Sequence, residues 1–213
     1  IMACNNDILP HICPDMPKDQ AEALKFPQKV PLSYINVALT NWRAFHKAGH
    51  HYFYCPKAFF PSLSLDFPVS MGGYKFSANP DQPILLHVVH VPVRQGEGLS
   101  AREQHRLGRH DIYNMTFADY EEKLMGQLQD MLGPFGFEAQ RDISAITVNR
   151  WPHGYAYEYN ELWEPWGWVD ETEEAPHIIG RKQMGRISIA NSDSEAFAYV
   201  NGAFDAASRA VKE

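Results

Sequence analysis

Gly185-Arg186-Ile187-Ser188-Ile189-Ala190-Asn191-Ser192-Asp193 and Tyr199-Val200-Asn201-Gly202-Ala203 are the two stretches that decide the fold. The first predicts a short strand that ends in an acidic turn, and the second opens an alanine-rich helix. The start of a helix presents unpaired N–H groups and a partial positive charge, which suit electron-rich or anionic atoms. Because this helix carries little side-chain bulk, we expect either a ligand or a tightly packed sheet to approach it closely.

The order of Gly-Arg, a small-residue strand, an acidic residue and Tyr-x-x-Gly-Ala resembles the C-terminal flavin-contacting motif of the flavin amine oxidase family. Upstream runs resemble the spermidine dehydrogenase-type branch of that family. These runs are Met2-Ala3-Cys4-Asn5, Ile12-Cys13-Pro14, residues 37–45 and residues 146–155. The last run, which contains Trp151, is the most specific of the four.

This resemblance implies an α+β fold and FAD as the cofactor. It assigns residues 1–180 to a mixed β-sheet substrate-binding lobe with flanking helices. Residues 181–213 then form a C-terminal strand and helix that complete an FAD-binding lobe. The implied reaction is oxidation of the C–N bond of an amine, such as the polyamine spermidine, by hydride transfer to the flavin.

The dinucleotide-binding fingerprint of the family, a Gly-x-Gly-x-x-Gly turn between a strand and a helix, is absent from this sequence. Gly96-Glu97-Gly98 is the nearest approach, and no third glycine follows it. We therefore expect this chain to be the C-terminal half of a larger flavoprotein that does not hold FAD alone. Its expected partner is a second chain, or the excised N-terminal half, carrying the Rossmann unit.

The resemblance also implies site residues. Tyr199 matches the tyrosine that forms one wall of an aromatic cage, which orients the amine against the flavin. Tyr155, Tyr157 and Tyr159 are candidates for the second wall, with Tyr157 taken as the catalytic candidate. Their spacing of two places all three on one face if the segment is a strand. His153 is a candidate polar group near the substrate, or a residue that holds the loop in place.

Further positions of the motif are implied to contact the cofactor. Asp193 matches an acidic residue near the ribityl or phosphate hydroxyls, and Val200 and Asn201 would present backbone N–H groups to the pyrimidine edge of the flavin. Arg186 would tie the strand to the cofactor lobe, or form a surface salt bridge. The remaining matched positions are Asn191, Ser192 and Ala203.

Composition excludes some function classes. The net charge is −7, from 19 Lys and Arg against 26 Asp and Glu. An acidic balance argues against a nucleic-acid partner and is compatible with a cationic small-molecule substrate. No apolar run approaches the roughly 20 residues that a membrane span requires. The sequence leaves the choice between periplasm and cytoplasm open.

The segment from Glu158 to Glu174 combines seven carboxylates with three tryptophans and contains no lysine or arginine. Carboxylates and aromatic faces together suit an organic polycation, through ion pairing and cation–π contact. A solvated acidic loop with tryptophans packed on the sheet is the alternative. His46, His50 and His51 lack an acidic or thiol partner in the sequence, so we expect no metal site.

Patterns of hydrophobicity and turn residues predict the secondary structure. The clearest helix spans 117–132, with a capping box between Thr116 and Asp119 and with Gly133 at its end. The strand at 84–91 is apolar on both faces and is expected to be central. Other helices are expected at 18–24, 41–47 and after residue 199, and other strands at 30–39, 52–54, 63–69, 143–150 and 187–190.

Two other functions remain open from the sequence. The same scaffold could act on another substrate class, such as an amino acid or a carotenoid-type molecule. An acid substrate would favour an arginine in the pocket, which the acidic loop does not offer. The second alternative is a non-catalytic accessory or remnant subunit of a hetero-oligomer.

Overall fold

The computed structural model describes the chain except residues 67–69, 95, 160–163 and 165–171. It divides into two compact units. Unit 1 joins residues 1–30 to residues 153–213, and unit 2 comprises residues 31–152. This division differs from the expected boundary at residue 180, because hydrogen bonds connect the first residues of the chain to residues 188–191. The assignment of a function to each lobe stays a prediction.

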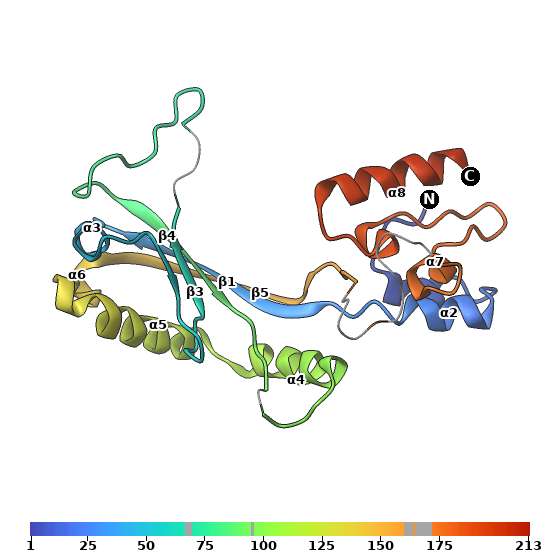
Figure 1. The fold of residues 1–213 in the computed structure, drawn as a ribbon, viewed down its shortest axis with the longest axis horizontal. Helices are drawn as coiled ribbons and strands as arrows, with labels where there is room; N and C mark the ends of the chain where they lie inside the picture. The colour runs from blue at the N-terminus through green and yellow to red at the C-terminus, as the bar shows by residue number, and fades with distance from the viewer. Residues whose placement is uncertain (67–69, 95, 160–163, 165–171) are drawn as a thin grey trace. The chain divides into compact units, whose positions relative to one another are not determined.

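Unit 2 is built on a five-stranded sheet with the order β2-β3-β4-β1-β5 (Figure 1). Pairings β2–β3, β3–β4 and β4–β1 are antiparallel. Because helices flank this antiparallel sheet, the α+β class is confirmed. The strands are β1 Val30–Leu39, β2 Tyr52–Tyr54, β3 Ser62–Leu65, β4 Ile84–His90 and β5 Ile143–Tyr155.

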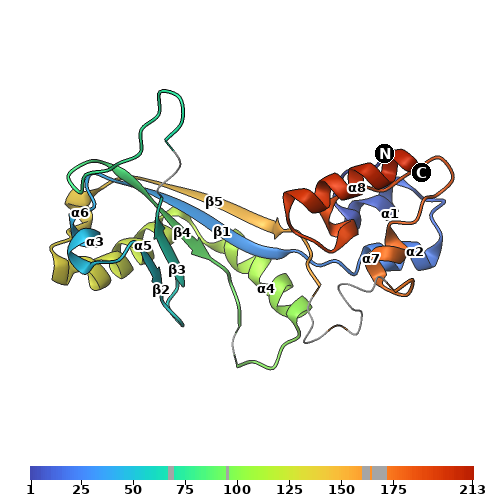
Figure 2. The ribbon, with the colours of Figure 1, turned by 45° about the horizontal axis from the view of Figure 1, so that its top comes forward.

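One face of this sheet is buried against helix α5, Phe117–Leu132 (Figures 1 and 2). The helix buries Tyr120, Leu124, Leu128 and Leu132, which recur every four residues and therefore form one stripe. Burying each leucine contributes roughly 1.5–3 kcal/mol. The capping box between Thr116 and Asp119 is confirmed, so both the start and the inner face of α5 follow from local sequence.

The central position of β4 is confirmed, but its two faces differ. Burial alternates along the strand, with Leu86 and Val88 fully buried and Leu85 46% exposed. The opposite face of the sheet, which we call the open face, is half-buried to exposed in unit 2. Tyr34, Asn36 and Ala38 of β1 lie on this open face beside Val89, His87 and Leu85 of β4.

Further helices of unit 2 frame the sheet. Helix α3, Arg43–Ala48, ends at Gly49, whose φ of 74° is the left-handed conformation that glycine adopts without strain. Helix α4, Ala101–Asn114, was missed by the sequence analysis, although Ser100 and Glu103 form a capping box at its start. The short helices η2 and α6 span Gly133–Phe135 and Ala139–Asp142.

Unit 1 is mostly helical. Helix α2, Lys18–Leu24, packs beside α7, Pro176–Gly180, in both views (Figures 1 and 2). Met2 and Ile189 form a parallel β-bridge, so the expected strand at 187–190 is reduced to single bridging residues. The remaining elements are η1 Asn6–Ile8, α1 Leu9–Ile12, η3 Ser192–Glu195 and α8 Val200–Lys212.

Candidate functional site

The start of α8 is an exposed part of the predicted site. Tyr199 occupies the N-cap position, and its side chain makes no capping hydrogen bond to the first turn. Tyr199 is 55% exposed, and its ring lies 5.0 Å from the ring of Phe197, centroid to centroid. A flat, exposed aromatic ring therefore stands beside an uncapped helix start, where backbone N–H groups carry partial positive charge.

Gly202 fixes this arrangement through close packing. A Cβ atom at Gly202 would lie 2.8 Å from the carbonyl oxygen of Phe197 and 2.9 Å from its Cδ1. Only a glycine allows Phe197 to sit this close to the helix. Since Phe197 contacts the ring of Tyr199, the small residue at 202 helps to position the candidate cage tyrosine.

The carboxylate of Asp193 is buried within unit 1. Its Oδ2 lies 2.9 Å from Nζ of Lys29, and its Oδ1 accepts a hydrogen bond of 3.0 Å from the N–H of Tyr157. The side chain is 1% exposed. These contacts give Asp193 a structural role in the chain by itself, and contact with a cofactor hydroxyl stays a prediction.

Asn191 and Ser192 hold the turn that carries Asp193. The Asn191 amide donates to the carbonyl oxygen of Cys4 at 2.8 Å and to Oδ1 of Asn6 at 2.7 Å. Its own Oδ1 accepts from the N–H of Ser194 at 3.0 Å, which caps η3. The carbonyl oxygen of Ser192 accepts from the N–H of Phe197. This network joins the first residues of the chain to the segment leading into α8.

The other predicted cofactor positions are accessible. Val200, Asn201 and Ala203 are all exposed on the first turn of α8. Arg186 is also exposed and makes no ion pair with any residue that the structure describes. The described residues therefore provide no partner for Arg186, either for the expected contact with a cofactor lobe or for the alternative surface salt bridge.

The three tyrosines near residue 157 do not share one face, because β5 ends at Tyr155. Tyr155 is 38% exposed, whereas Tyr157 is buried and donates from its hydroxyl to Oε2 of Glu164 at 2.7 Å. Tyr159 donates to the backbone oxygen of the same glutamate at 2.8 Å. The ring of Tyr157 packs edge-on against Phe26, so it is oriented into unit 1. His153 is exposed on β5.

Unit 2 offers a second candidate surface on the open face of its sheet. The rings of Tyr34 and His87 lie 5.1 Å apart, and Nδ1 of His87 lies 3.3 Å from Oδ1 of Asn36. At one end of the sheet lies a hollow of about 550 Å³. Its lining mixes apolar strand residues with polar groups from the following loop, including Leu85, Ser144, Asp66, Tyr74 and Lys75.

His46, His50 and His51 line a separate hollow of about 450 Å³ beside Trp42 and Phe45. Within the part of the chain that the structure describes, no three potential ligand side chains gather as a metal site, and no helix is long and apolar enough to cross a membrane. Most of the acidic, tryptophan-containing segment, including Trp163, Trp166 and Trp168, lies outside the described residues.

Two residues near the site were missed by sequence reasoning. Lys29 precedes β1 and carries no motif, yet it supplies the positive charge opposite Asp193. Glu164 lies in the acidic segment, for which polycation binding and a solvated loop were both left open, and its carboxylate accepts a hydrogen bond from Tyr157. Neither pairing leaves a local signal in the sequence. Asp193 lies far from Lys29 along the chain, and Tyr157 and Glu164 are 7 residues apart with no motif that links them.

Solved structures of amine oxidases are similar in fold to this chain. A variant of putrescine oxidase matches 99% of this chain with a TM-score of 0.61 and 12% sequence identity. Cyclohexylamine oxidase from Brevibacterium oxydans IH-35A matches 99% of the chain with a TM-score of 0.57 and 11% identity. Wild-type putrescine oxidase bound to putrescine matches 98% of it, also with a TM-score of 0.57.

No protein-family model matches the sequence, and no curated protein matches it either. The chain covers only 41% of the putrescine oxidase variant and 42% of cyclohexylamine oxidase. The chain therefore has the fold of about two fifths of an amine oxidase.

Proposed function

We propose that this chain is the substrate-binding and C-terminal cofactor-contacting part of an FAD-dependent oxidoreductase that oxidises the C–N bond of an amine. The likeness to amine oxidases supports the scaffold, and by itself it supports no particular chemistry. The observation that carries the proposal is the uncapped start of α8 beside the exposed ring of Tyr199.

The residues present fit one edge of a flavin. The first turn of α8 carries exposed Val200, Asn201 and Ala203, which leaves this turn accessible to a ligand. Partial positive charge at a helix start suits the electron-rich pyrimidine edge. The side chains of Asn191 and Asp193 contact other groups within the chain, and their contact with the cofactor stays a prediction.

FAD would supply the hydride acceptor. The residues of this chain would orient the amine and exclude water. Tyr199 offers a flat wall that limits the rotation of a bound amine, which raises the effective concentration of the reactive geometry. Unit 2 by itself offers a separate polar and aromatic surface at Tyr34 and His87.

The proposal includes a partner. The chain spans about two fifths of the amine oxidases it resembles, so the Rossmann part that binds the bulk of FAD would lie outside residues 1–213, in a second chain or in an N-terminal half. A polyamine such as spermidine is the proposed substrate within the amine class, since the acidic segment from Glu158 to Glu174 matches a polycation in charge.

The test is purification of the native assembly through an affinity tag on this chain, followed by visible absorbance. We expect flavin bands that bleach when spermidine, putrescine or cyclohexylamine is added without oxygen. An amino acid serves as the control substrate: bleaching by the amino acid alone would move the chain to that substrate class. A colourless assembly would leave the non-catalytic accessory role.

Activity should depend on pH through the substrate. A protonated amine carries no lone pair to assist removal of hydride, so the rate should rise as the substrate amine loses its proton. A rate that stays constant from about pH 6 to pH 10 would contradict amine oxidation by this route.

A further inference from the structure

His90 lies at the end of strand β4 and is surrounded by aromatic rings. The residue is 8% exposed, and its imidazole stacks on the ring of Phe59, with 3.9 Å between centroids and 11° between planes. The rings of Phe60 and Tyr120 lie edge-on to it at 6.1 Å and 6.4 Å. We call these four residues the aromatic cluster. Phe59 and Phe60 come from the segment between β2 and β3, and Tyr120 comes from α5. The imidazole of His90 therefore joins three parts of unit 2.

The hydrogen bond of His90 determines which ring nitrogen carries the proton. Nδ1 lies 2.7 Å from the backbone oxygen of Phe59. Because a carbonyl oxygen only accepts, Nδ1 carries the proton of the neutral ring, and a second proton would have to bind Nε2. Within the part of the chain that the structure describes, His90 makes no second hydrogen bond. A protonated ring would therefore place a positive charge among aromatic side chains with no oxygen to accept from Nε2–H.

The charged groups near His90 do not favour a cation at this position. Nζ of Lys123, on α5, lies 5.0 Å from the centroid of the Phe59 ring, so this ring already faces one positive charge. Asp111, on α4, is the negative group nearby, and both of its carboxylate oxygens accept from Nη2 of Arg94, at 2.7 Å and 2.9 Å. Burial is the main cause of a lowered pKa for His90, and Lys123 adds to it. The hydrogen bond from Nδ1 to Phe59 and the charge of Asp111 oppose this effect in part.

The other polar group of the aromatic cluster is neutral. The hydroxyl of Tyr120 lies 2.7 Å from Oγ of Ser33, the residue that pairs with His90 across β1 and β4. Burial is the main cause that raises the pKa of Tyr120, so the phenol stays protonated at any pH at which a histidine titrates. His90 is therefore the member of the aromatic cluster that changes charge in mildly acid solution.

We propose that neutral His90 is an acid-sensitive contact that holds α5 and the segment of Phe59 and Phe60 against the sheet, and that its protonation loosens this side of unit 2. The pKa of His90 in the folded chain lies below the unfolded value of about 6.5. The stabilisation by the neutral ring is therefore complete above that pH and is lost as the pH falls from there towards the folded value. Acid thus acts on the scaffold of unit 2, independently of the reaction proposed for the chain.

The experiment is amide hydrogen exchange of the full-length protein at about pH 7.5 and about pH 5, corrected for the intrinsic pH dependence of exchange. The variant His90→Gln cannot ionise, and its amide can still donate to the backbone oxygen of Phe59. His46→Gln is the matched control, since it removes an exposed histidine of the same unit. Circular dichroism at the higher pH checks that both variants fold.

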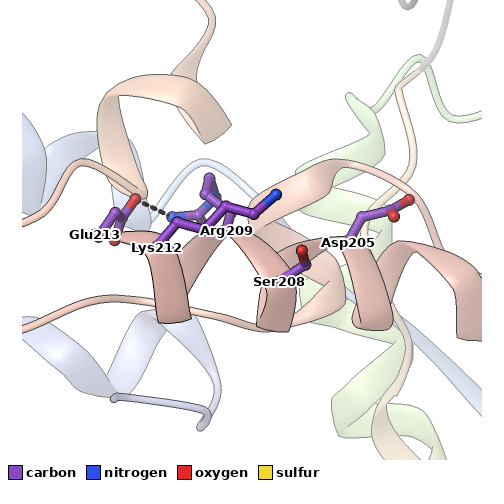
Figure 3. A pocket seen from close by; sticks show the side chains of 5 residues that line it. All are labelled: Asp205, Ser208, Arg209, Lys212 and Glu213. Atoms are coloured by element: carbon purple, nitrogen blue, oxygen red, sulfur yellow. Dashed lines mark hydrogen bonds and ion pairs between the residues drawn. The ribbon is translucent and has the colours of Figure 1, made fainter.

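Helix α8 in unit 1 serves as the reference element. It contains no histidine, and histidine is the side chain whose ordinary pKa lies in the range tested. A polar hollow of about 430 Å³ on this helix is lined by Asp205, Ser208, Arg209, Lys212 and Glu213 (Figure 3). The protection of α8 therefore reports on effects of acid that do not act through His90.

We expect β3 and α5 of the unmodified protein and of His46→Gln to exchange about threefold faster or more at the lower pH, relative to α8. His90→Gln should show no such change. The proposal is overturned if β3 and α5 of the unmodified protein keep their protection, or if His90→Gln loses it to the same extent. Should His90→Gln fail to fold, NMR titration of the histidines in the unmodified protein decides. A midpoint for His90 below that of the exposed His46 supports the proposal, and a midpoint equal to it or above it overturns the proposal.

Discussion

Asp193 and Lys29 form a buried ion pair of 2.9 Å between two segments that lie far apart in the sequence. The carboxylate is 1% exposed and the lysine side chain 19% exposed. A buried charge needs a partner because desolvation is costly. The pair therefore joins the end of the N-terminal segment to the turn that leads into the candidate site.

The pair predicts a characteristic pattern in a double-mutant cycle. Lys29→Met should destabilise the chain by about 3 kcal/mol, because it leaves the Asp193 carboxylate buried without its cation. Adding Asp193→Asn should restore a large part of that loss, since the unpaired charge is removed. The free energy of unfolding is measured by urea titration of the chain without cofactor. Strictly additive effects would show that the two residues do not interact.

Two glycine substitutions should act in opposite directions. Gly202→Ala places a Cβ 2.8 Å from the Phe197 carbonyl oxygen, so it should destabilise unit 1 by about 1–3 kcal/mol through overpacking. Gly126→Ala in the middle of α5 meets no atom within 4 Å. It should stabilise the chain by about 1 kcal/mol, the difference in helix propensity. Thermal unfolding of both variants is the measurement, and a stabilised Gly202→Ala would contradict the close packing.

Asp142 should make stability depend on pH in the acid range. Hydrogen bonds from Arg141 lower the pKa of this carboxyl to about 2, assisted by the backbone N–H of Glu138 and the amide of Asn41. Because the folded pKa is below the unfolded value of about 3.9, the stabilisation is complete above pH 4 and is lost as the pH falls towards 2. This contribution is about 2 kcal/mol.

The control for that prediction is Asp142→Asn. The variant should be less stable than the unmodified chain at pH 7, and the difference should shrink as the pH falls from 4 to 2. Urea titrations at several pH values give both numbers. A difference that is the same at pH 7 and pH 2 would mean that ionisation of Asp142 does not stabilise the fold.

Substitutions at Tyr199 and Tyr157 should affect kcat/KM and the free energy of unfolding to different extents. Tyr199 is 55% exposed, so Tyr199→Ala should change the free energy of unfolding by less than about 0.5 kcal/mol. In the flavin-containing assembly it should lower kcat/KM for an amine by about tenfold or more, because the substrate loses an orienting wall. Unchanged kcat/KM would remove Tyr199 from the site.

Tyr157→Phe is the matched comparison. It deletes the hydroxyl that donates to Glu164 at 2.7 Å, and we expect a loss of stability of about 1–2 kcal/mol for a hydrogen bond to a charged acceptor. Its effect on kcat/KM should be smaller than that of Tyr199→Ala. The reverse order would return Tyr157 to the role of second cage wall.

Local patterns in the sequence were sufficient for much of unit 2. The capping box at Thr116 and the four-residue recurrence of Tyr120, Leu124, Leu128 and Leu132 predict the start and the buried face of α5. The bounds of β1 and β2 also agree with expectation, as do those of α2 in unit 1. In α4 the arginines and histidines mask a short buried pair, Gly108 and Ile112, so the apolar periodicity is weak and the helix was missed.

The sequence by itself determined the elements whose signals lie within one turn of helix or one strand, together with the Tyr199-to-Ala203 start of α8. The tertiary structure alone decided which groups meet. Lys29 opposes Asp193, Tyr157 turns inward to Glu164, and β4 has one open face although its sequence is apolar on both. The reason is physical: capping and periodicity act between neighbouring residues, whereas charge pairing and burial depend on chain segments that only folding brings together.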